Sequence, residues 1–272
     1  MAFFRSLGRV TALSFLSGVV RWRWALLVAL FALAAGLVAD TLQYLFDTDH
    51  ISRRVDVWDI FPALLRHMYV LHFLFCFGFL LFVGDHFHRQ RDLGTSTLFA
   101  VRMPSRRLYW LGNMGAIGIN AFLFMLACWL ISLFVGFIMV PPSSLWPMVS
   151  RDTVRPLAIP LQMPIPVFSF LLALYTAWGL WIAGSVVMLV STFFKNTAVL
   201  LGTITGWVLL SLALSWNTYW PWQRFVYIGE LIGHHKHFGE RAISLPTFFL
   251  GSSLMLMAIA LIGSWRMRRE EV

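Results

Sequence analysis

The chain has 272 residues, of which 59% are hydrophobic and 12% are charged. Charged residues approach a quarter of an ordinary soluble domain, so this composition excludes that class and predicts an integral membrane protein. The formal net charge of +9 is explained first by the excess of Lys and Arg in the cytosolic loops of membrane proteins, and we expect no nucleic-acid partner.

Long apolar runs divide the chain. A helix needs about 20 mostly apolar residues to cross a bilayer, and the runs lack the alternation of barrel strands. The sequence therefore predicts an all-α integral membrane protein with six transmembrane helices in a single transmembrane domain, residues 1–272. The predicted spans are about 24–46, 67–84, 110–140, 164–194, 197–219 and 247–265.

Residues 1–23 precede the first span and carry four arginines and no acid among many apolar side chains. This pattern is typical of a basic amphipathic helix that lies along the inner leaflet of a membrane. We expect Arg21 and Arg23 to anchor its end at the membrane surface.

Small residues recur at helical spacing in the first and fifth predicted spans. Ala32 and Gly36 lie in the first, and Gly202 and Gly206 lie in the fifth, where they favour close packing against another helix. Asp40 falls in the outer third of the first span. It is either a functional carboxylate or a residue that reaches the outer headgroups.

The mixed-charge residues 47–66 predict an outer loop, with a short helix that ends near Pro62. The prolines in 141–163 predict an irregular segment, and Lys195-Asn196 predicts a tight turn. Residues 220–232 are too apolar for a solvated loop and too short to span, which predicts an apolar interfacial or re-entrant hairpin between spans five and six. With both termini in the cytosol, 13 of the 21 Lys and Arg residues lie on the inner side, as the positive-inside bias requires.

The basic stretch 85–109 is the longest polar interruption between two apolar runs. Asp92 or Thr95 can cap a short helix over about 93–103, and Pro104 ends it. Ser105 can cap the following helix, and Arg106 and Arg107 would then lie at the inner headgroup level. The stretch predicts a helix across the inner surface that is anchored at both ends.

This stretch resembles the first cytoplasmic loop of the ABC-2 type permeases, the transmembrane subunits of ATP-binding-cassette exporters. The pattern is an acid, Gly-Thr, a short helix, Arg-x-Pro-Ser-Arg-Arg, and Leu-Gly before a long span. The matching residues are Asp92, Gly94, Thr95, Leu98, Arg102, Pro104, Ser105, Arg106, Arg107, Leu111 and Gly112. The plan of six spans, a leading amphipathic helix and a hairpin before the last span is similar as well.

The resemblance implies a coupling helix at about 93–103 that docks on a separate cytosolic nucleotide-binding ATPase subunit. ATP and Mg would bind that partner, because this chain has no P-loop sequence, and we expect no cofactor, metal or catalytic residue here. A second permease chain would pair through spans one and five, in the bacterial inner membrane. The residues that the resemblance assigns to coupling are Asp92, Gly94, Thr95, Leu98, Phe99, Arg102 and Pro104.

Two alternatives from other classes stay open. The histidine pairs and the run at 234–237 resemble the clusters of membrane metalloenzymes, although the predicted topology puts them on opposite faces of the membrane. The chain could also be an immunity or scaffold protein with no ATPase. The histidines concerned are His67, His72, His86, His88, His234, His235 and His237. Cys76 and Cys128 lie in apolar runs, which predicts packing roles.

Overall fold

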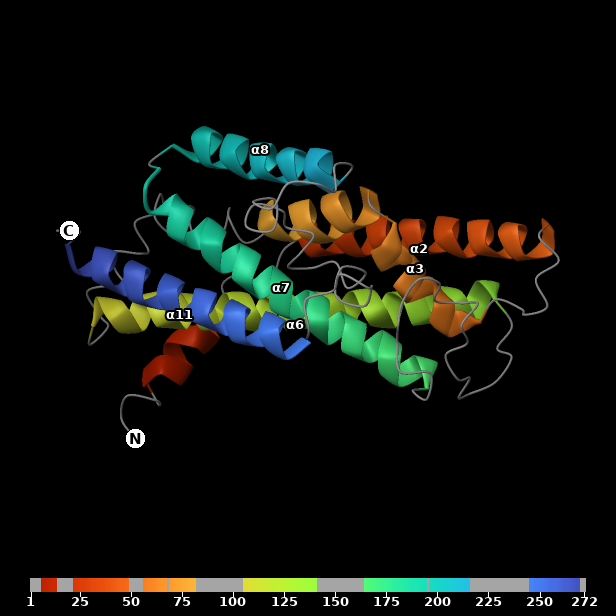
Figure 1. The fold of residues 1–272 in the computed structure, drawn as a ribbon, viewed down its shortest axis with the longest axis horizontal. Coiled ribbons are helices and arrows are strands. Elements are labelled where there is room, and N and C mark those ends of the chain that lie inside the picture. Colours follow the sequence, from red (N-terminus) through yellow and green to blue (C-terminus); the bar gives the residue numbers. More distant parts are fainter. Residues whose placement is uncertain are drawn as a thin grey trace.

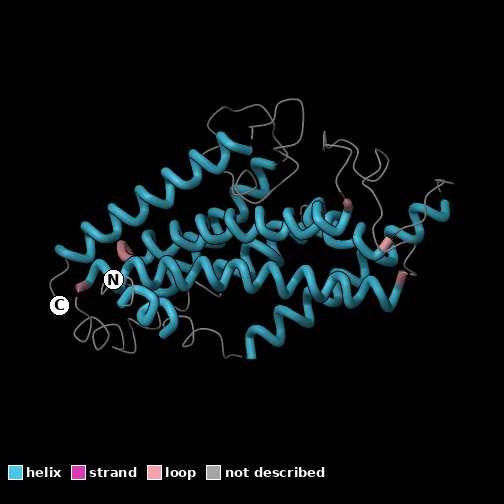
Figure 2. The backbone as a smooth tube through the Cα atoms, turned by 90° about the horizontal axis from the view of Figure 1, so that it is seen from below, coloured by secondary structure: helices cyan, strands magenta, loops and turns pink. Residues whose placement is uncertain are grey.

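The computed structural model describes residues 6–13, 22–48, 56–67, 69–81, 105–140, 164–194, 196–215 and 245–269. Every element in these ranges is helical (Figure 2). Five of the helices are long and apolar enough to cross a membrane, and the number rises to six if one bent pair counts as a single span. The prediction of a helical membrane protein is therefore confirmed at this coarser level.

The long helices follow the predicted apolar runs to within a few residues. The first helix is short and covers residues 6–13. It is followed by α2, the short elements η1 and α3, the π-helical segment η2 and the long α6. The bounds are α2 Trp22–Thr48, η1 Val57–Asp59, α3 Ile60–Arg66, η2 Val70–Phe77, α6 Arg106–Met139, α7 Ile165–Ser191, α8 Thr197–Ser215 and α11 Leu245–Arg269. The continuous apolar runs locate these helices because backbone groups in a bilayer must bond within the segment.

α6 lies at the centre of the bundle and contacts α7, α2, α11 and α3. Its 34 residues make a rod about 51 Å long, at 1.5 Å per residue, which is longer than a bilayer core of about 30 Å. The short helix, the start of α6 and the end of α11 lie together at one end of the bundle, at the left of Figure 1, where both chain ends also lie.

The second predicted span is bent rather than straight. Residues Val57–Arg66 and Val70–Leu81 together are apolar enough to span, but their axes meet at 88°, which is the geometry of a broken span or a re-entrant loop. Most of the segment after the bend is π-helical, a form usually confined to single turns and frequent at functional sites.

The short helix predicted within residues 47–66 is present, but it covers residues 57–66 and continues past Pro62. Asp56 and Asp59 are buried, so this half of the segment is not the exposed loop that its charges predicted. The Asp56 backbone N–H donates to Asp59 Oδ2 at 2.9 Å, so these carboxylates belong to the start of a helix. Pro62 lies in the first turn of α3 rather than at its end, where a missing N–H breaks no helical bond.

Phenylalanines from four elements hold the bent segment in the core. Phe75 makes edge-on contacts with Phe31 of α2, Phe61 of α3 and Phe124 of α6, at ring-centroid distances of 5.2, 6.3 and 6.4 Å. Phe79 also contacts Phe124. Because such pairs contribute beyond their buried area, the bend is supported by packing on both of its sides.

Three predicted features lie outside the described residues. They are the helix at 93–103, the proline-rich segment 141–163 and the hairpin at 220–232. The leading helix is described only over 6–13, and α2 begins at Trp22, two residues before the predicted start of the first span.

Candidate functional site: the basic end of the bundle

The described part of the predicted site begins at the start of α6. Ser105 is in an extended conformation, and its hydroxyl accepts a hydrogen bond from the Leu108 backbone N–H at 3.3 Å. This is the predicted N-cap, and it satisfies one of the donors that a helix start leaves unpaired. Arg106 is half-buried and Arg107 is exposed, so the cap places these two arginines at the end of the bundle.

The aromatic pair that follows is buried in protein rather than lying at the membrane surface. Tyr109 and Trp110 are 2% and 0% exposed. The Trp110 ring fills the space beside Gly263 of α11, where an added Cβ would overlap it. The Asn113 side-chain amide donates to the Tyr109 carbonyl at 2.9 Å. α6 and α11 are therefore in direct contact at this end.

The short helix over 6–13 docks on α6 at two glycines. A Cβ at Gly112 would overlap Val10, which is buried, and one at Gly115 would lie 3.1 Å from the Thr11 hydroxyl. The missing side chains let the two backbones approach closely. Gly112 belongs to the stretch that resembles the permease loop, so this glycine has a packing role in the chain itself.

A further contact joins the ends of α11 and α7. The Arg266 guanidinium donates to the Thr192 carbonyl at 2.9 Å and lies 4.0 Å from the centre of the Phe193 ring. A cation at a helix C-terminus binds carbonyls that the helix leaves unpaired and complements the helix dipole. Sequence reasoning missed this residue, although an arginine directly after an apolar run was a usable signal.

Hydrogen bonds from two tryptophans connect the helices that carry the candidate site. Trp181 of α7 donates its indole N–H to the Met114 carbonyl at 2.9 Å, and its ring lies over Gly118. Trp178 donates to the Ser252 hydroxyl of α11 at 2.9 Å, and the two indoles meet edge-on at 5.2 Å. α6, α7 and α11 therefore form one connected unit, which we name the tryptophan core.

Charge is segregated along the bundle. Three exposed arginines, Arg9, Arg107 and Arg268, come from three elements that meet at one end, which we name the basic end. The acids of the described chain lie toward the opposite end, in the second half of α2 and at the start of the bent segment. Those with described side chains are Asp40, Asp56 and Asp59. The basic end therefore carries a positive field that no described acid offsets.

Most residues of the predicted coupling site lie in parts of the chain that the structure does not describe. Asp92, Gly94, Thr95, Leu98, Phe99, Arg102, Pro104 and the anchor Arg21 lie outside the described residues, and Arg23 is described only as backbone. Ser105, Arg106 and Arg107 are described, and they form the start of α6, directly after the predicted coupling helix.

The residues predicted to pair two chains lie in different surroundings. Gly202 and Gly206 are exposed on α8, and among the described residues no atom lies within 4 Å of a Cβ added at either glycine. Ala32 and Gly36 are half-buried on α2, and Gly36 lies near Met139 of α6. The open face is therefore the one on α8.

The histidines do not gather where the structure describes them. His67 is exposed and His72 is 0% exposed. Within the described ranges, no group of three or more His, Cys, Asp or Glu side chains could hold a metal ion. His86, His88 and His234–His237 lie outside those ranges. Cys76 and Cys128 are buried free thiols, as predicted, and Asp40 is exposed on α2.

Comparisons of the whole chain with models of known protein families and with curated proteins find no match in either case.

Proposed function

We propose that this chain is the permease subunit of an ABC transporter of the ABC-2 type. The proposal rests on the sequence of residues 92–112, which joins an acid-x-Gly-Thr start to Arg-x-Pro-Ser-Arg-Arg and Leu-Gly. Its geometric support is the position of Ser105 and the start of α6, at the end of the bundle where helix 6–13 and the end of α11 also lie (Figure 1).

In this proposal the helix at 93–103 transmits force from a cytosolic ATPase. Asp92, Gly94 and Thr95 set its start, and Arg106 and Arg107 hold its end at the inner surface of a bacterial inner membrane. Movement of the helix acts on α6, which is continuous from Arg106 to Met139 and contacts the helices around it. The cargo is hydrophobic, a peptide, an antibiotic or a lipid-like molecule, and it is exported.

A co-purification experiment tests the ATPase partner. The chain would be solubilised from its native membranes as wild type, as Gly94→Trp/Arg102→Glu, and as Arg66→Glu. The last variant reverses an exposed arginine of α3 at the opposite end of the bundle and is the matched control. We expect a P-loop ATPase to accompany wild type and the control but not the first variant, with all three folded.

Absence of an ATPase from the wild-type preparation would reject the permease function and favour a scaffold or immunity role. A bound transition metal in the same preparation would favour the metalloenzyme alternative instead.

Pairing with a second permease chain needs a separate test. Gly202 and Gly206 line an open face of α8, so we propose that this face contacts the partner chain. In Gly202→Leu/Gly206→Leu we expect two differently tagged copies to stop co-purifying while each copy stays folded. Co-purification at the wild-type level would reject pairing through α8.

A further inference from the structure

We propose that the basic end of the bundle binds anionic phospholipid headgroups, and that these lipids join helix 6–13, α6 and α11. The inference does not depend on the transport function, because it concerns how the chain is held in its membrane.

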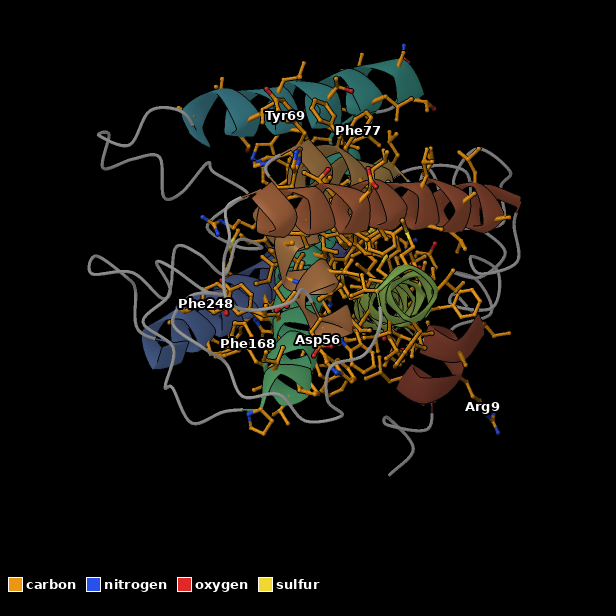
Figure 3. The ribbon with its side chains drawn as sticks, turned by 90° about the vertical axis from the view of Figure 1, so that its right-hand side faces the viewer. Arg9, Asp56, Tyr69, Phe77, Phe168 and Phe248 are labelled. Atoms are coloured by element: carbon orange, nitrogen blue, oxygen red, sulfur yellow. The ribbon has the colours of Figure 1, made fainter. Side chains whose placement is uncertain are left out.

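The arginines of the basic end are available to an external anion. Arg9, Arg107 and Arg268 are exposed, and none of them makes a hydrogen bond or ion pair with any part of the chain that the structure describes. Arg9 projects away from the bundle (Figure 3). Arg266 differs from them, since its guanidinium is already bound to Thr192 and Phe193.

Packing brings the three arginine-bearing elements to one place. Helix 6–13 lies against Gly112, which is five residues, or about 7.5 Å of helix rise, beyond Arg107. Gly263 of α11 lies against Trp110, which is less than one turn from Arg107. The end of α11, with Arg268, therefore lies beside the start of α6, and headgroups in one patch of the inner leaflet can contact all three elements.

Apolar side chains are exposed among these arginines, which favours a lipid over a soluble acidic protein. Leu13 is 50% exposed beside Arg9, and Trp265 is 54% exposed beside Arg268. Tryptophan prefers the membrane–water interface, and leucine on a basic amphipathic helix inserts among acyl chains. A lipid leaflet accommodates both kinds of side chain, because arginines contact the headgroups while Leu13 and Trp265 contact the acyl and interfacial region.

The guanidinium group sets the chemical class of lipid. It donates two parallel hydrogen bonds to a phosphate and keeps its charge at all relevant pH values. In phosphatidylcholine the choline cancels the phosphate charge, whereas phosphatidylglycerol has no such cation. Because no described acid lies at this end to compete for the arginines, the surface should select net anionic headgroups.

The test uses the full chain in nanodiscs of phosphatidylcholine alone and of equal parts phosphatidylcholine and phosphatidylglycerol. The variants are Arg9→Gln/Arg107→Gln/Arg268→Gln and its three single changes. Arg66→Gln, which changes an exposed arginine of α3 at the opposite end, is the control. Native mass spectrometry measures the retained phosphatidylglycerol, and thermal unfolding measures the gain in Tm that the anionic lipid gives.

We expect wild type and Arg66→Gln to retain phosphatidylglycerol and to gain in Tm. The triple variant should retain severalfold less and gain nothing, with its Tm in phosphatidylcholine unchanged. Salt should lower the retention in wild type, because it screens exposed charges. If the triple variant does not fold in phosphatidylcholine, the three single variants are used instead. Each of them should lose part of the retained phosphatidylglycerol.

Two results would overturn the proposal. The first is wild-type retention of phosphatidylglycerol in the triple variant and in every single variant. The second is an equal loss of retention in Arg66→Gln, which would show non-specific attraction.

Discussion

α7 and α8 follow one another in the chain and are both apolar enough to span a membrane, yet they are packed very differently. In α7, 67% of the residues are buried, whereas only 22% are buried over 197–214 of α8. α7 carries Trp178 and Trp181, whose indoles donate to α11 and α6. In α8, the hydroxyls of Thr203 and Thr205 donate hydrogen bonds to backbone carbonyls of α8 itself. Apolarity therefore indicates which segments can enter the bilayer, whereas the buried fraction and the indole bonds of Trp178 and Trp181 show how tightly α7 is packed.

The largest expected difference between the two helices comes from tryptophan removal. Trp181→Ala removes the bond to Met114 and empties the space over Gly118, so we expect it to destabilise the fold by about 3 kcal/mol. Trp207→Ala on the more exposed α8 should cost clearly less. Chemical denaturation in mixed micelles measures both. Equal losses would show that α8 belongs to the core.

A glycine comparison should show the next largest effect. Gly263→Leu places a side chain where the Trp110 ring lies, so we expect a loss of about 1–3 kcal/mol and a lower Tm. A Cβ added at Gly206 on α8 meets no described atom within 4 Å, and leucine improves helix propensity, so the Tm of Gly206→Leu should hold or rise. Tm values of the monomeric chain in detergent check both, and a large loss in Gly206→Leu would contradict the open face.

A substitution of Arg266 tests how much its contacts with the end of α7 stabilise the tryptophan core. Arg266→Gln removes the cation from the end of α7 and from the Phe193 ring, and we expect a loss of about 1–2 kcal/mol. Arg268→Gln makes the same change two residues away on an exposed side chain and should change stability little in lipid-free detergent. If the two variants lose equal stability, the bond to Thr192 is not the cause.

The smallest effect is expected from single hydroxyls. Ser252→Ala removes the acceptor of the Trp178 indole, and interhelical hydrogen bonds in membranes contribute about 0.6 kcal/mol on average. Thr203→Ala removes a hydroxyl that bonds only within α8 and should be neutral. A double-mutant cycle with Trp178→Phe isolates the pair, and a coupling energy of zero would remove this bond from the core.

The sequence predicted the straight helices well because one physical requirement determines them. α6, α7, α8 and α11 begin within about four residues of their predicted starts, and the Ser105 cap was predicted too. A long apolar run must form a helix in a bilayer, and proline or a capping residue marks its ends.

The bent segment could not be predicted in the same way. Asp56 and Asp59 indicate a solvated loop when only their charges are considered, but the bond from the Asp56 backbone N–H to the Asp59 carboxylate lets them begin a buried helix. The 88° bend depends on contacts with Phe31, Phe61 and Phe124, which are distant in the sequence. The bond between Arg266 and Thr192 could not be predicted either, because these residues are 74 positions apart in the sequence.

The length of α6 has a mechanical consequence. It is a helix of 34 residues without a proline. With a length of about 51 Å, it forms a straight, stiff rod along the bundle. A tilt of about 10° around its midpoint moves one end relative to the other by about 9 Å, for a rod of that length. Any force applied where Ser105 begins the helix is therefore felt at Gly136, against which Val57 and Ile60 of the bent segment are packed. The two ends of the bundle are connected by a single rigid element.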